Sequence, residues 1–333
     1  MIKIPKNYQA KLSLIQTEEA IKFIKDNFES KLAQNLKLIR VSAPVFLDPD
    51  LTLNDELNGL ENPVSFKVTN NNKKLEIIQS LAKRKRNALK KYNCNEHEGI
   101  YADMNAIRKN ETLDNIHSIY VDQRDWEKIV LKDDRNLEYL FKIVKIIYQT
   151  IQEIEHAVNT KYSVFTEKLP QNITFISTSE LEKRYPNKSR KERENLITKE
   201  FKAVFLYQIG WPLKDGLPHD GRAADYDDWN YNGDILVYNP ILKEVLEISS
   251  MGIRVDENSI IKQLEFKNET KKIYTPYCQN IINKSLPYTI GGGIGQSRLC
   301  LFFLEKAHIG EVQASYWDKE DIENANENNI NLL

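Results

Sequence analysis

Hydrophobic residues along the chain follow both helical and strand spacings, which predicts a protein that mixes α-helices with β-strands. Apolar positions recur every three or four residues in 18–36 and in 137–158, so each segment is expected to form an amphipathic helix. Residues 64–69 and 75–78 flank Asn-Asn-Asn-Lys and indicate a hairpin. Further strands are expected at residues 38–46, 100–108, 118–126, 174–176, 203–209, 233–238 and 244–249, and further helices at residues 78–92, 256–268 and 271–284.

The strands arrive in hairpin-like pairs instead of alternating singly with helices. This order is typical of an antiparallel sheet covered by helices, so the expected fold class is α+β. No repeat, low-complexity tract or Pro/Gly/Ser-rich linker divides the chain. We therefore expect residues 1–333 to form a single domain, with a helical insertion at approximately 137–200.

The overall charge gives no sign of a nucleic-acid or membrane-surface partner. The 333 residues include 47 basic and 48 acidic ones, which leaves a net charge of −1. No apolar segment approaches the roughly 20 residues of a membrane span, and the N-terminal Met-Ile-Lys-Ile-Pro-Lys has no signal core. Three widely spaced cysteines form no zinc pattern and suit a reducing compartment, so a cytoplasmic protein is expected.

The densest cluster of glycines stands at Gly291-Gly-Gly-Ile-Gly295, where four of the twelve glycines fall just before an apolar run that predicts a helix. Glycines let a ligand lie close to the backbone, and the following helix presents unpaired N–H groups to an anion. Arg298, in the first turn of that helix, would add a permanent positive charge. No Gly-Lys-Ser/Thr follows, so the segment is not a P-loop.

A lysine falls on the apolar stripe of the helix expected at 78–92. Lys85 is four residues from both Leu81 and Leu89, whereas the neighbouring Lys83 and Arg86 are expected on a solvated face. An ammonium group on the inner face needs an anion, because burying it unpaired is costly. The alternative is a lysine that snorkels at the edge of the core, and Lys85 taken alone favours that alternative.

Polar residues also continue a strand face that begins as apolar. Gln123 and Asp125 follow Ile119 and Val121 with a period of two, so their side chains should project together. A carboxylate beside an amide could hold a substrate ammonium group. A polar strand end is an equally good account of this pair.

Acidic residues on two neighbouring strands suggest a divalent cation. Glu247 and Ser249 are expected on the face opposite Leu246 and Ile248, and Asp234 lies on the adjacent strand. Adjacent carboxylates repel one another unless a cation lies between them, and Mg²⁺ with nucleotide phosphates is the usual reason.

The remaining polar clusters receive weaker interpretations. The acidic segment 225–229 is expected to be a solvated loop, and His97, His219 and His308 have no spacing typical of a metal site or a nucleophile–base pair. Together, the polar residues describe a site that activates an amino acid with ATP. Its members are Arg108, Arg254 and Arg298 for phosphates, Glu247 and Asp234 for a metal, Lys85 for a carboxylate, and Asp125 with Gln123 for an ammonium group.

The glycine run and its arginine are similar to the third signature motif of class II aminoacyl-tRNA synthetases. From near its start to near its end, the chain also resembles the ammonia-dependent asparagine synthetases, or aspartate–ammonia ligases. The resemblance rests on the blocks Asn54–Gly59, Ser80–Arg86, His117–Trp126, Asp225–Trp229, Asn232–Leu236, Glu247–Arg254 and Gly291–Leu299.

This resemblance implies a class II synthetase-like catalytic domain, a homodimer, and the condensation of L-aspartate with ammonia to L-asparagine. ATP would be cleaved to AMP and pyrophosphate through a β-aspartyl-AMP intermediate, with Mg²⁺ accompanying the nucleotide. The partners would be ATP, aspartate and ammonia, without nucleic acid or membrane.

The same resemblance implies roles for single residues. Arg108 matches the arginine that grips the α-phosphate, and Arg298 matches the arginine at the adenine and the γ-phosphate. Asp55 matches a position near the substrate side chain, where ammonia arrives, and these three residues are expected to be catalytic. The expected aspartate-binding residues are Lys85, Gln123, Asp125, Asp227, Ser250 and Arg254, and the expected ATP-binding residues are Arg108, Asp234, Glu247, Ser249, Gly292, Gly293 and Arg298, of which Glu247 and Asp234 would also hold the metal.

Two other functions remain open at the level of sequence. A complete aminoacyl-tRNA synthetase would need an anticodon-binding domain or a basic surface, and neither is evident here. A non-catalytic relative would use the same fold for binding or regulation, and the presence of Arg108, Glu247, Arg254 and Arg298 argues against it.

Overall fold

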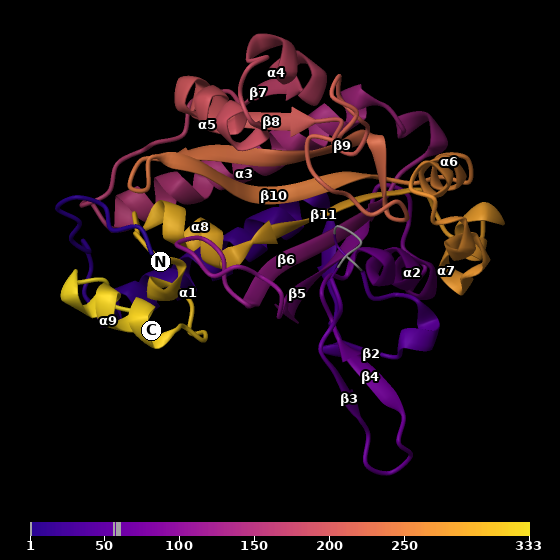
Figure 1. The fold of residues 1–333 in the computed structure, drawn as a ribbon, viewed down its shortest axis with the longest axis horizontal. Helices are drawn as coiled ribbons and strands as arrows, with labels where there is room; N and C mark the ends of the chain where they lie inside the picture. Colours follow the sequence, from indigo (N-terminus) through magenta and orange to yellow (C-terminus); the bar gives the residue numbers. More distant parts are fainter. Residues whose placement is uncertain (1, 56, 58–60) are drawn as a thin grey trace.

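The computed structural model describes residues 2–55, 57 and 61–333. Its centre is an eight-stranded sheet in the order β1-β5-β6-β11-β10-β9-β8-β7 (Figure 1). Neighbouring strands are antiparallel except in the pairs β1–β5 and β7–β8, so the predicted antiparallel sheet is confirmed for its central strands. The strands are β1 (Leu38–Arg40), β5 (Gly99–Ile107), β6 (Tyr120–Ile129), β11 (Thr289–Gly295), β10 (Glu244–Arg254), β9 (Asp227–Asn239), β8 (Ala203–Tyr207) and β7 (Thr174–Ser177).

A smaller sheet of three strands extends away from the body of the molecule (Figure 1). β3 (Ser65–Lys67) and β4 (Lys74–Ile77) form the predicted hairpin, and β2 (Phe46–Leu47) pairs with the other edge of β4. Phe46 and Phe66 pack edge to face, with 5.5 Å between their ring centres.

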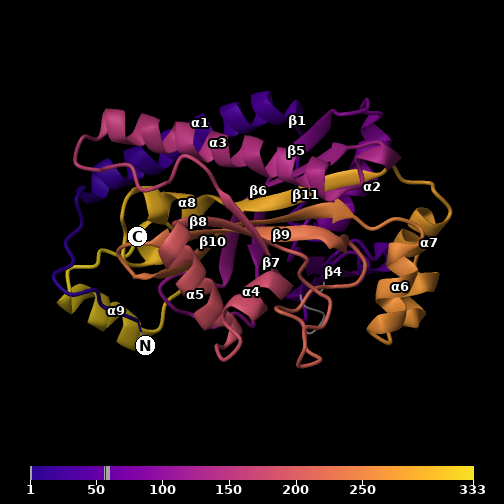
Figure 2. The same cartoon turned by 90° about the horizontal axis from the view of Figure 1, so that it is seen from above.

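Two long helices cover one face of the large sheet (Figure 2). α1 (Leu14–Leu36) and α3 (Leu137–Lys161) lie against each other and bury their apolar stripes in the largest hydrophobic core. The first helix begins earlier than predicted, because Ser13 and not Thr17 caps it. Ser13 forms a reciprocal capping box with Gln16, which satisfies backbone N–H groups at the helix start.

Shorter helices cover the opposite face and the ends of the sheet. α4 (Thr178–Arg184) and α5 (Arg190–Phe201) pack on β7 to β10 through a separate apolar cluster. The other helical elements are α2 (Ala82–Tyr92), α6 (Ser259–Phe266), α7 (Pro276–Ile282), α8 (Gln296–Phe303), α9 (Lys319–Glu327) and the 3-10 turns η1 (Pro49–Leu51), η2 (Lys132–Asp134), η3 (Thr270–Tyr274) and η4 (Ile309–Glu311). Within the described ranges, no helix combines the length and the apolar character needed to cross a membrane.

Two predictions of solvent exposure were wrong. Asp225, Asp227 and Asp228 are buried, and the last two belong to β9 and not to a solvated loop. Lys83 and Arg86 of α2 are also buried. Their burial is tolerated because each charge has a partner: Lys83 lies 2.6 Å from Asp225, and Arg86 donates to two backbone carbonyl oxygens.

Candidate functional site

A polar cleft lies on the sheet face that α1 and α3 leave uncovered. Its walls form three adjoining cavities of about 200 to 270 Å³, and the Glu247 side chain lines all three. Arg108 and Gln123 line the first and second cavities, and Arg298 lines the first and third. The shared walls bring residues from β6, β10, β11 and the start of α8 to one place.

The glycines of β11 make room for side chains from the two neighbouring strands. A Cβ atom at Gly291 would lie 2.0 Å from Glu127 Oε2, and one at Gly293 would lie 2.3 Å from Gln123 Oε1. The space over these two glycines is therefore used partly by the protein's own polar groups. Gly292 and Gly293 line the second cavity, as expected of residues close to a ligand.

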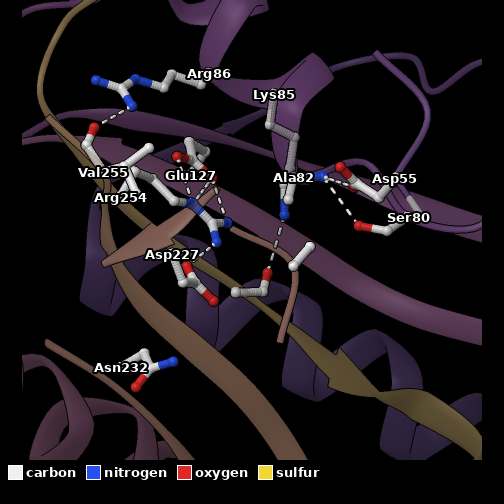
Figure 3. A network of polar contacts seen from close by, with 12 residues as sticks. Asp55, Ser80, Ala82, Lys85, Arg86, Glu127, Asp227, Asn232, Arg254 and Val255 are labelled. Carbon is white, nitrogen blue, oxygen red and sulfur yellow. Dashed lines mark hydrogen bonds and ion pairs between the residues drawn. The ribbon is translucent and has the colours of Figure 1, made fainter. Parts of the chain in front are cut away.

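A buried ion cluster joins β6, β10 and β9 at the floor of the cleft (Figure 3). Arg254 donates to Glu127 from Nε and from Nη2, the latter at 2.7 Å, and donates to Asp227 from Nη1 at 2.5 Å. Burial favours the protonated carboxyl of Glu127, but the Arg254 guanidinium outweighs it and holds the pKa of Glu127 below its usual value. Burial dominates at Asp227 and raises its pKa.

Lys85 finds its counterion in the neighbouring strand. Its ammonium group points from α2 toward the sheet (Figure 3), pairs with Asp125 and donates to the backbone oxygen of Gly292 at 3.1 Å. Asp125 and Gly292 line the second cavity, whereas Lys85 lies behind them and lines none of the three cavities. Lys85 and Asp125 are both buried. The prediction that Lys85 faces inward and needs an anion is confirmed, and the alternative of a snorkelling lysine is wrong.

Gln123 and Asp125 share a face of β6, as their spacing predicted. They are register partners of Gly295 and Gly293 in β11, and both line the second cavity. The next residue on that face is Glu127, which the sequence analysis left without a role. Extending the same period of two by one step would have identified it.

Arg108 and Arg298 bring two guanidinium groups to the same cleft. Arg108 donates weakly to the backbone oxygen of Gln79, at 3.3 and 3.4 Å. Arg298 donates to the backbone oxygen of Glu247 at 3.0 Å, and its Nη1 lies 3.7 Å from the carboxylate of that residue. Both arginines therefore keep N–H groups for a ligand, since a guanidinium carries five donors.

Asp234 lies on β9, beside Glu247 of β10. The Arg222 guanidinium is 2.5 Å from Asp234 Oδ2, while Oδ1 is buried without a hydrogen-bond partner. Burial, together with Glu247, raises the pKa of Asp234 to about 7 against the opposing effect of Arg222. No group of three or more His, Cys, Asp or Glu side chains in the described ranges is placed to hold a metal by itself. Two carboxylates with an unpaired oxygen fit a Mg²⁺ that takes its other ligands from phosphates and water.

The expected alternation along β10 fails at Ser249. A bulge between Glu247 and Ser249 shifts the register, so that Ser249 pairs with Ile235 and Ser250 pairs with Asp234. Ser250 consequently joins Glu247 at the cleft, whereas Ser249 does not line any of the three cavities and its hydroxyl is buried without a partner. The prediction that the Ser249 side chain shares the face of Glu247 was wrong, because the bulge inserts one extra residue.

Asp55 lies at the side of the cleft, near the start of α2 (Figure 3). Its Oδ2 accepts from the Ala82 backbone N–H at 3.2 Å, and its Oδ1 is 3.9 Å from Lys83 Nζ. Burial raises the pKa of Asp55 to about 6 despite the nearby ammonium group. Asp55 lines a further cavity, and Ala82 lines the second cavity of the cleft. Residues 56 and 58–60 of the matching block lie outside the described residues.

Several site residues escaped the sequence analysis. Arg222, Tyr226 and Asp220 line the second cavity, and His219 lines the third. All four belong to the irregular segment between β8 and β9, where no periodicity indicates which side chains point inward.

Comparisons with known proteins agree with this arrangement. Residues 15–329 match the family model described as aspartate-ammonia ligase. The chain is 54% identical to the aspartate–ammonia ligase of Clostridium tetani over 331 residues, covering 99% of this chain and 97% of the relative. It is 56% identical to that of Malacoplasma penetrans over 323 residues, covering 97% and 99%.

Solved structures show the same fold at much lower identity. The asparaginyl-tRNA synthetase of Pyrococcus horikoshii complexed with asparaginyl-adenylate superposes with a TM-score of 0.66 at 16% identity, covering 90% of this chain and 68% of that one. A putative aspartyl-tRNA synthetase from Leishmania major gives a TM-score of 0.61 at 13% identity, covering 90% and 65%. The fold is thus the predicted class II synthetase-like one. The match to the family model and the identity to full-length relatives show that the chain belongs to the aspartate–ammonia ligase family.

Proposed function

We propose that the chain catalyses ATP-dependent ligation of L-aspartate and ammonia to L-asparagine, releasing AMP and pyrophosphate. The observation that carries the proposal is the composition of one cleft. Arg108 and Arg298 line its first cavity and can bind phosphates there. Arg108 also lines the second cavity, together with Asp125 of the buried Lys85–Asp125 pair. Membership of the family supports the same reaction.

Aspartate would bind in the second cavity. Its ammonium group would take Asp125 and the Gln123 amide oxygen, while a carboxylate would take Lys85. Arg254 is fixed by two carboxylates, so Asp227 and Glu127 would set the direction of its remaining N–H groups. Ser250 adds a hydroxyl on the same wall.

ATP would lie along the first and third cavities, with Arg108 at the α-phosphate and Arg298 farther along the chain of phosphates. The aspartate β-carboxylate would attack the α-phosphorus in line, and pyrophosphate would leave, giving β-aspartyl-AMP. Positioning and charge neutralisation supply most of the catalysis in such a step. Asp234 and Glu247 would hold Mg²⁺, which would neutralise charge on the phosphate oxygens.

Ammonia would then attack the activated β-carbonyl, and AMP would leave. An ammonium ion has no lone pair, so a base must first remove a proton. Asp55 suits this role because burial keeps its pKa at about 6, closer to neutrality than that of an exposed aspartate. The walls around the intermediate would also keep water from hydrolysing it.

The experiment that tests this function is AMP release from ATP with aspartate, with and without ammonium. Release that depends on ammonium and yields asparagine is the expected result. Dependence on tRNA would instead identify an aminoacyl-tRNA synthetase, and absence of turnover would identify a non-catalytic relative. We also propose that the enzyme is cytoplasmic, since its three cysteines are free, as expected in a reducing compartment. We propose further that it is a homodimer, because the family resemblance implies a dimer.

Arg298 provides a more direct test of adenylate formation, the first of the two proposed steps. Arg298→Ala removes a guanidinium from the nucleotide cavities, and we expect aspartate-dependent ATP–pyrophosphate exchange to fall by about 10²–10³-fold, as for other preorganised charges at a transition state. Arg184→Ala is the control, because that arginine is exposed and pairs with Glu200 away from the cleft. Near-normal exchange in Arg298→Ala would refute the role of Arg298.

A further inference from the structure

The cavity that Asp55 lines, here called the side cavity, is separate from the three cavities of the cleft. It has a volume of about 310 Å³, and its walls come from η1, β4, the start of α2 and η3. Apart from Asp55, none of the residues proposed to bind aspartate or ATP lines it. The side cavity therefore has no part in the functions assigned so far, except through Asp55.

The first residues of α2 and those just before them separate the side cavity from the second cavity of the cleft. Ser80 and Ala82 line the second cavity, whereas Gln79 and Lys83 line the side cavity. The Asp55 carboxylate accepts from the Ala82 backbone N–H at 3.2 Å, which places it at this boundary (Figure 3). Asp55 is thus reached from the side cavity and borders the pocket proposed for aspartate.

The charges around the side cavity are mainly negative. Its described walls carry four carboxylates and two ammonium groups, from Asp55, Glu61, Glu76, Asp225, Lys83 and Lys272. Lys83 pairs with Asp225 at 2.6 Å and is 3.9 Å from Asp55, which is beyond hydrogen-bond distance. This balance of charge favours a cation in the cavity.

Two buried oxygen atoms on these walls have no hydrogen-bond partner within the part of the chain that the structure describes. They are Oδ1 of Asp55 and Oε1 of Gln79, and each residue is 1% exposed. Both atoms are acceptors, and leaving them unsatisfied is costly, so each indicates a donor that the protein does not supply. An ammonium ion donates from every N–H bond and accepts from none. A water molecule could also donate to both oxygens, but the negative walls favour the cation.

We propose that the side cavity is the entrance and the binding site for ammonium, apart from the cleft that receives aspartate and ATP. Gln79 and Glu76 would hold the ion beside Asp55. The Asp55 carboxylate would take one proton from it, and neutral ammonia would pass to the activated β-carbonyl, while the proton leaves to water in the side cavity. The proposal rests on the ligase function and adds a second route, because bound aspartate and ATP occupy the cleft when ammonia is needed.

The test compares the KM for ammonium in asparagine formation with the KM for aspartate and with ATP–pyrophosphate exchange, which needs no ammonium. Gln79→Met removes the acceptor oxygen and keeps the length of the side chain, and Glu76→Gln removes one negative charge from the wall. Asp50→Asn is the matched control, because Asp50 is exposed and pairs with Lys73 outside the side cavity.

We expect the KM for ammonium to rise about tenfold in Gln79→Met, the size of one lost hydrogen bond to a charged group. The rise should be smaller in Glu76→Gln, because Glu76 also pairs with Lys74 at 3.0 Å. The KM for aspartate and the exchange rate should stay near those of the unmodified protein. Asp50→Asn should match the unmodified protein in all three measurements.

Asn62→Trp tests the side cavity as a route. Asn62 is exposed and lines this cavity, so a large ring there narrows the cavity without disturbing a hydrophobic core. We expect kcat/KM for ammonium to fall at least as far as in Gln79→Met, while exchange persists. Potassium chloride tests the identity of the cation: if potassium raises the activity and Gln79→Met abolishes that rise, the cavity holds an activating cation and the inference is overturned.

The outcomes separate this inference from the ligase function. If the unmodified protein makes asparagine and the three cavity variants keep its KM and kcat/KM for ammonium, the inference is overturned and the ligase proposal stands. Equal losses in exchange and in amide formation also overturn it, because the effect then reaches the aspartate or nucleotide pocket. An unmodified protein that releases no AMP in response to ammonium overturns the ligase proposal itself.

Discussion

At the scale of single residues, the site depends on charges that are buried with only part of their hydrogen-bonding capacity used. Asp55 is an example: it accepts one backbone N–H, and its other oxygen has no hydrogen-bond partner. Burial raises its pKa to about 6, so the carboxylate forms only as the pH rises through that value. Any step that needs this base should therefore slow down in acid.

Asp55→Asn should impair amide formation more than adenylate formation. In the unmodified protein, asparagine formation at saturating ammonium should rise with pH through about 6, whereas Asp55→Asn should lack this rise. Measuring asparagine formation and ATP–pyrophosphate exchange side by side checks both statements. Equal losses in the two half-reactions would remove Asp55 from the ammonia step.

The sequence predicts those site residues that interrupt a regular pattern. Lys85 interrupts a helical stripe, and Gln123 with Asp125 continues an apolar strand face, so spacing singles out all three. Spacing leaves a structural alternative open for each of them, and the burial of Lys85 against Asp125 decides between the two accounts. The spacing of apolar residues does not predict the burial of Lys83. That burial depends on the ion pair with Asp225, which lies 142 residues away in sequence. A partner at that distance becomes visible only in the folded chain.

At the scale of elements, the ion pairs of one arginine link three strands of the large sheet. Arg254 of β10 reaches Glu127 of β6 across β11 and Asp227 of β9 on its other side. The glycine at position 291 leaves the space through which the first of these contacts passes. The cluster that orients Arg254, which we propose to bind aspartate, thus also holds the three strands together.

Glu127→Ala should lower the free energy of unfolding by about 3–5 kcal/mol, because it leaves Arg254 with one counterion in a buried site. Asp26→Ala is the control: it removes an exposed i,i+4 pair with Lys22 and should cost under about 1 kcal/mol. Urea unfolding followed by circular dichroism compares the two. A similar small loss in both variants would show that the cluster contributes little to stability.

Element boundaries were hardest to predict where strands carry polar residues. The start of β9 contains Asp227, Asp228, Asn230 and Asn232, a composition that indicates a loop. These side chains are accommodated by specific partners, such as the Ile209 backbone for Asn232. The bulge that displaces Ser249 likewise could not be predicted from the pattern of hydrophobic residues.

At the scale of the whole molecule, apolar side chains remain exposed at one edge of the large sheet. β1 is the outermost strand there, and its Ile39 is 63% exposed. Val45, which follows in the segment before β2, is also exposed. An open strand edge with apolar residues is suited to pairing with another chain, in line with the proposed homodimer.

Ile39→Lys should weaken this association and shift the protein toward the mass of one chain in sedimentation experiments. A buried charge at the interface is costly, whereas the same charge on a free surface is not. Leu217→Lys is the control, since Leu217 is 61% exposed in the segment near α5, at the other side of the sheet. If both variants remain dimers, the dimer contact lies elsewhere.

The pairing of Lys85 with Asp125 has a consequence for which molecules can enter the pocket. The two charges of the pair already balance in the free protein, so a molecule with charges of only one sign would pair with one partner and leave the other buried without a counterion. A zwitterion exchanges with both partners at once and keeps the interior balanced. Succinate, which has the carboxylates of aspartate but no amino group, should therefore be a poor competitor despite its similar shape.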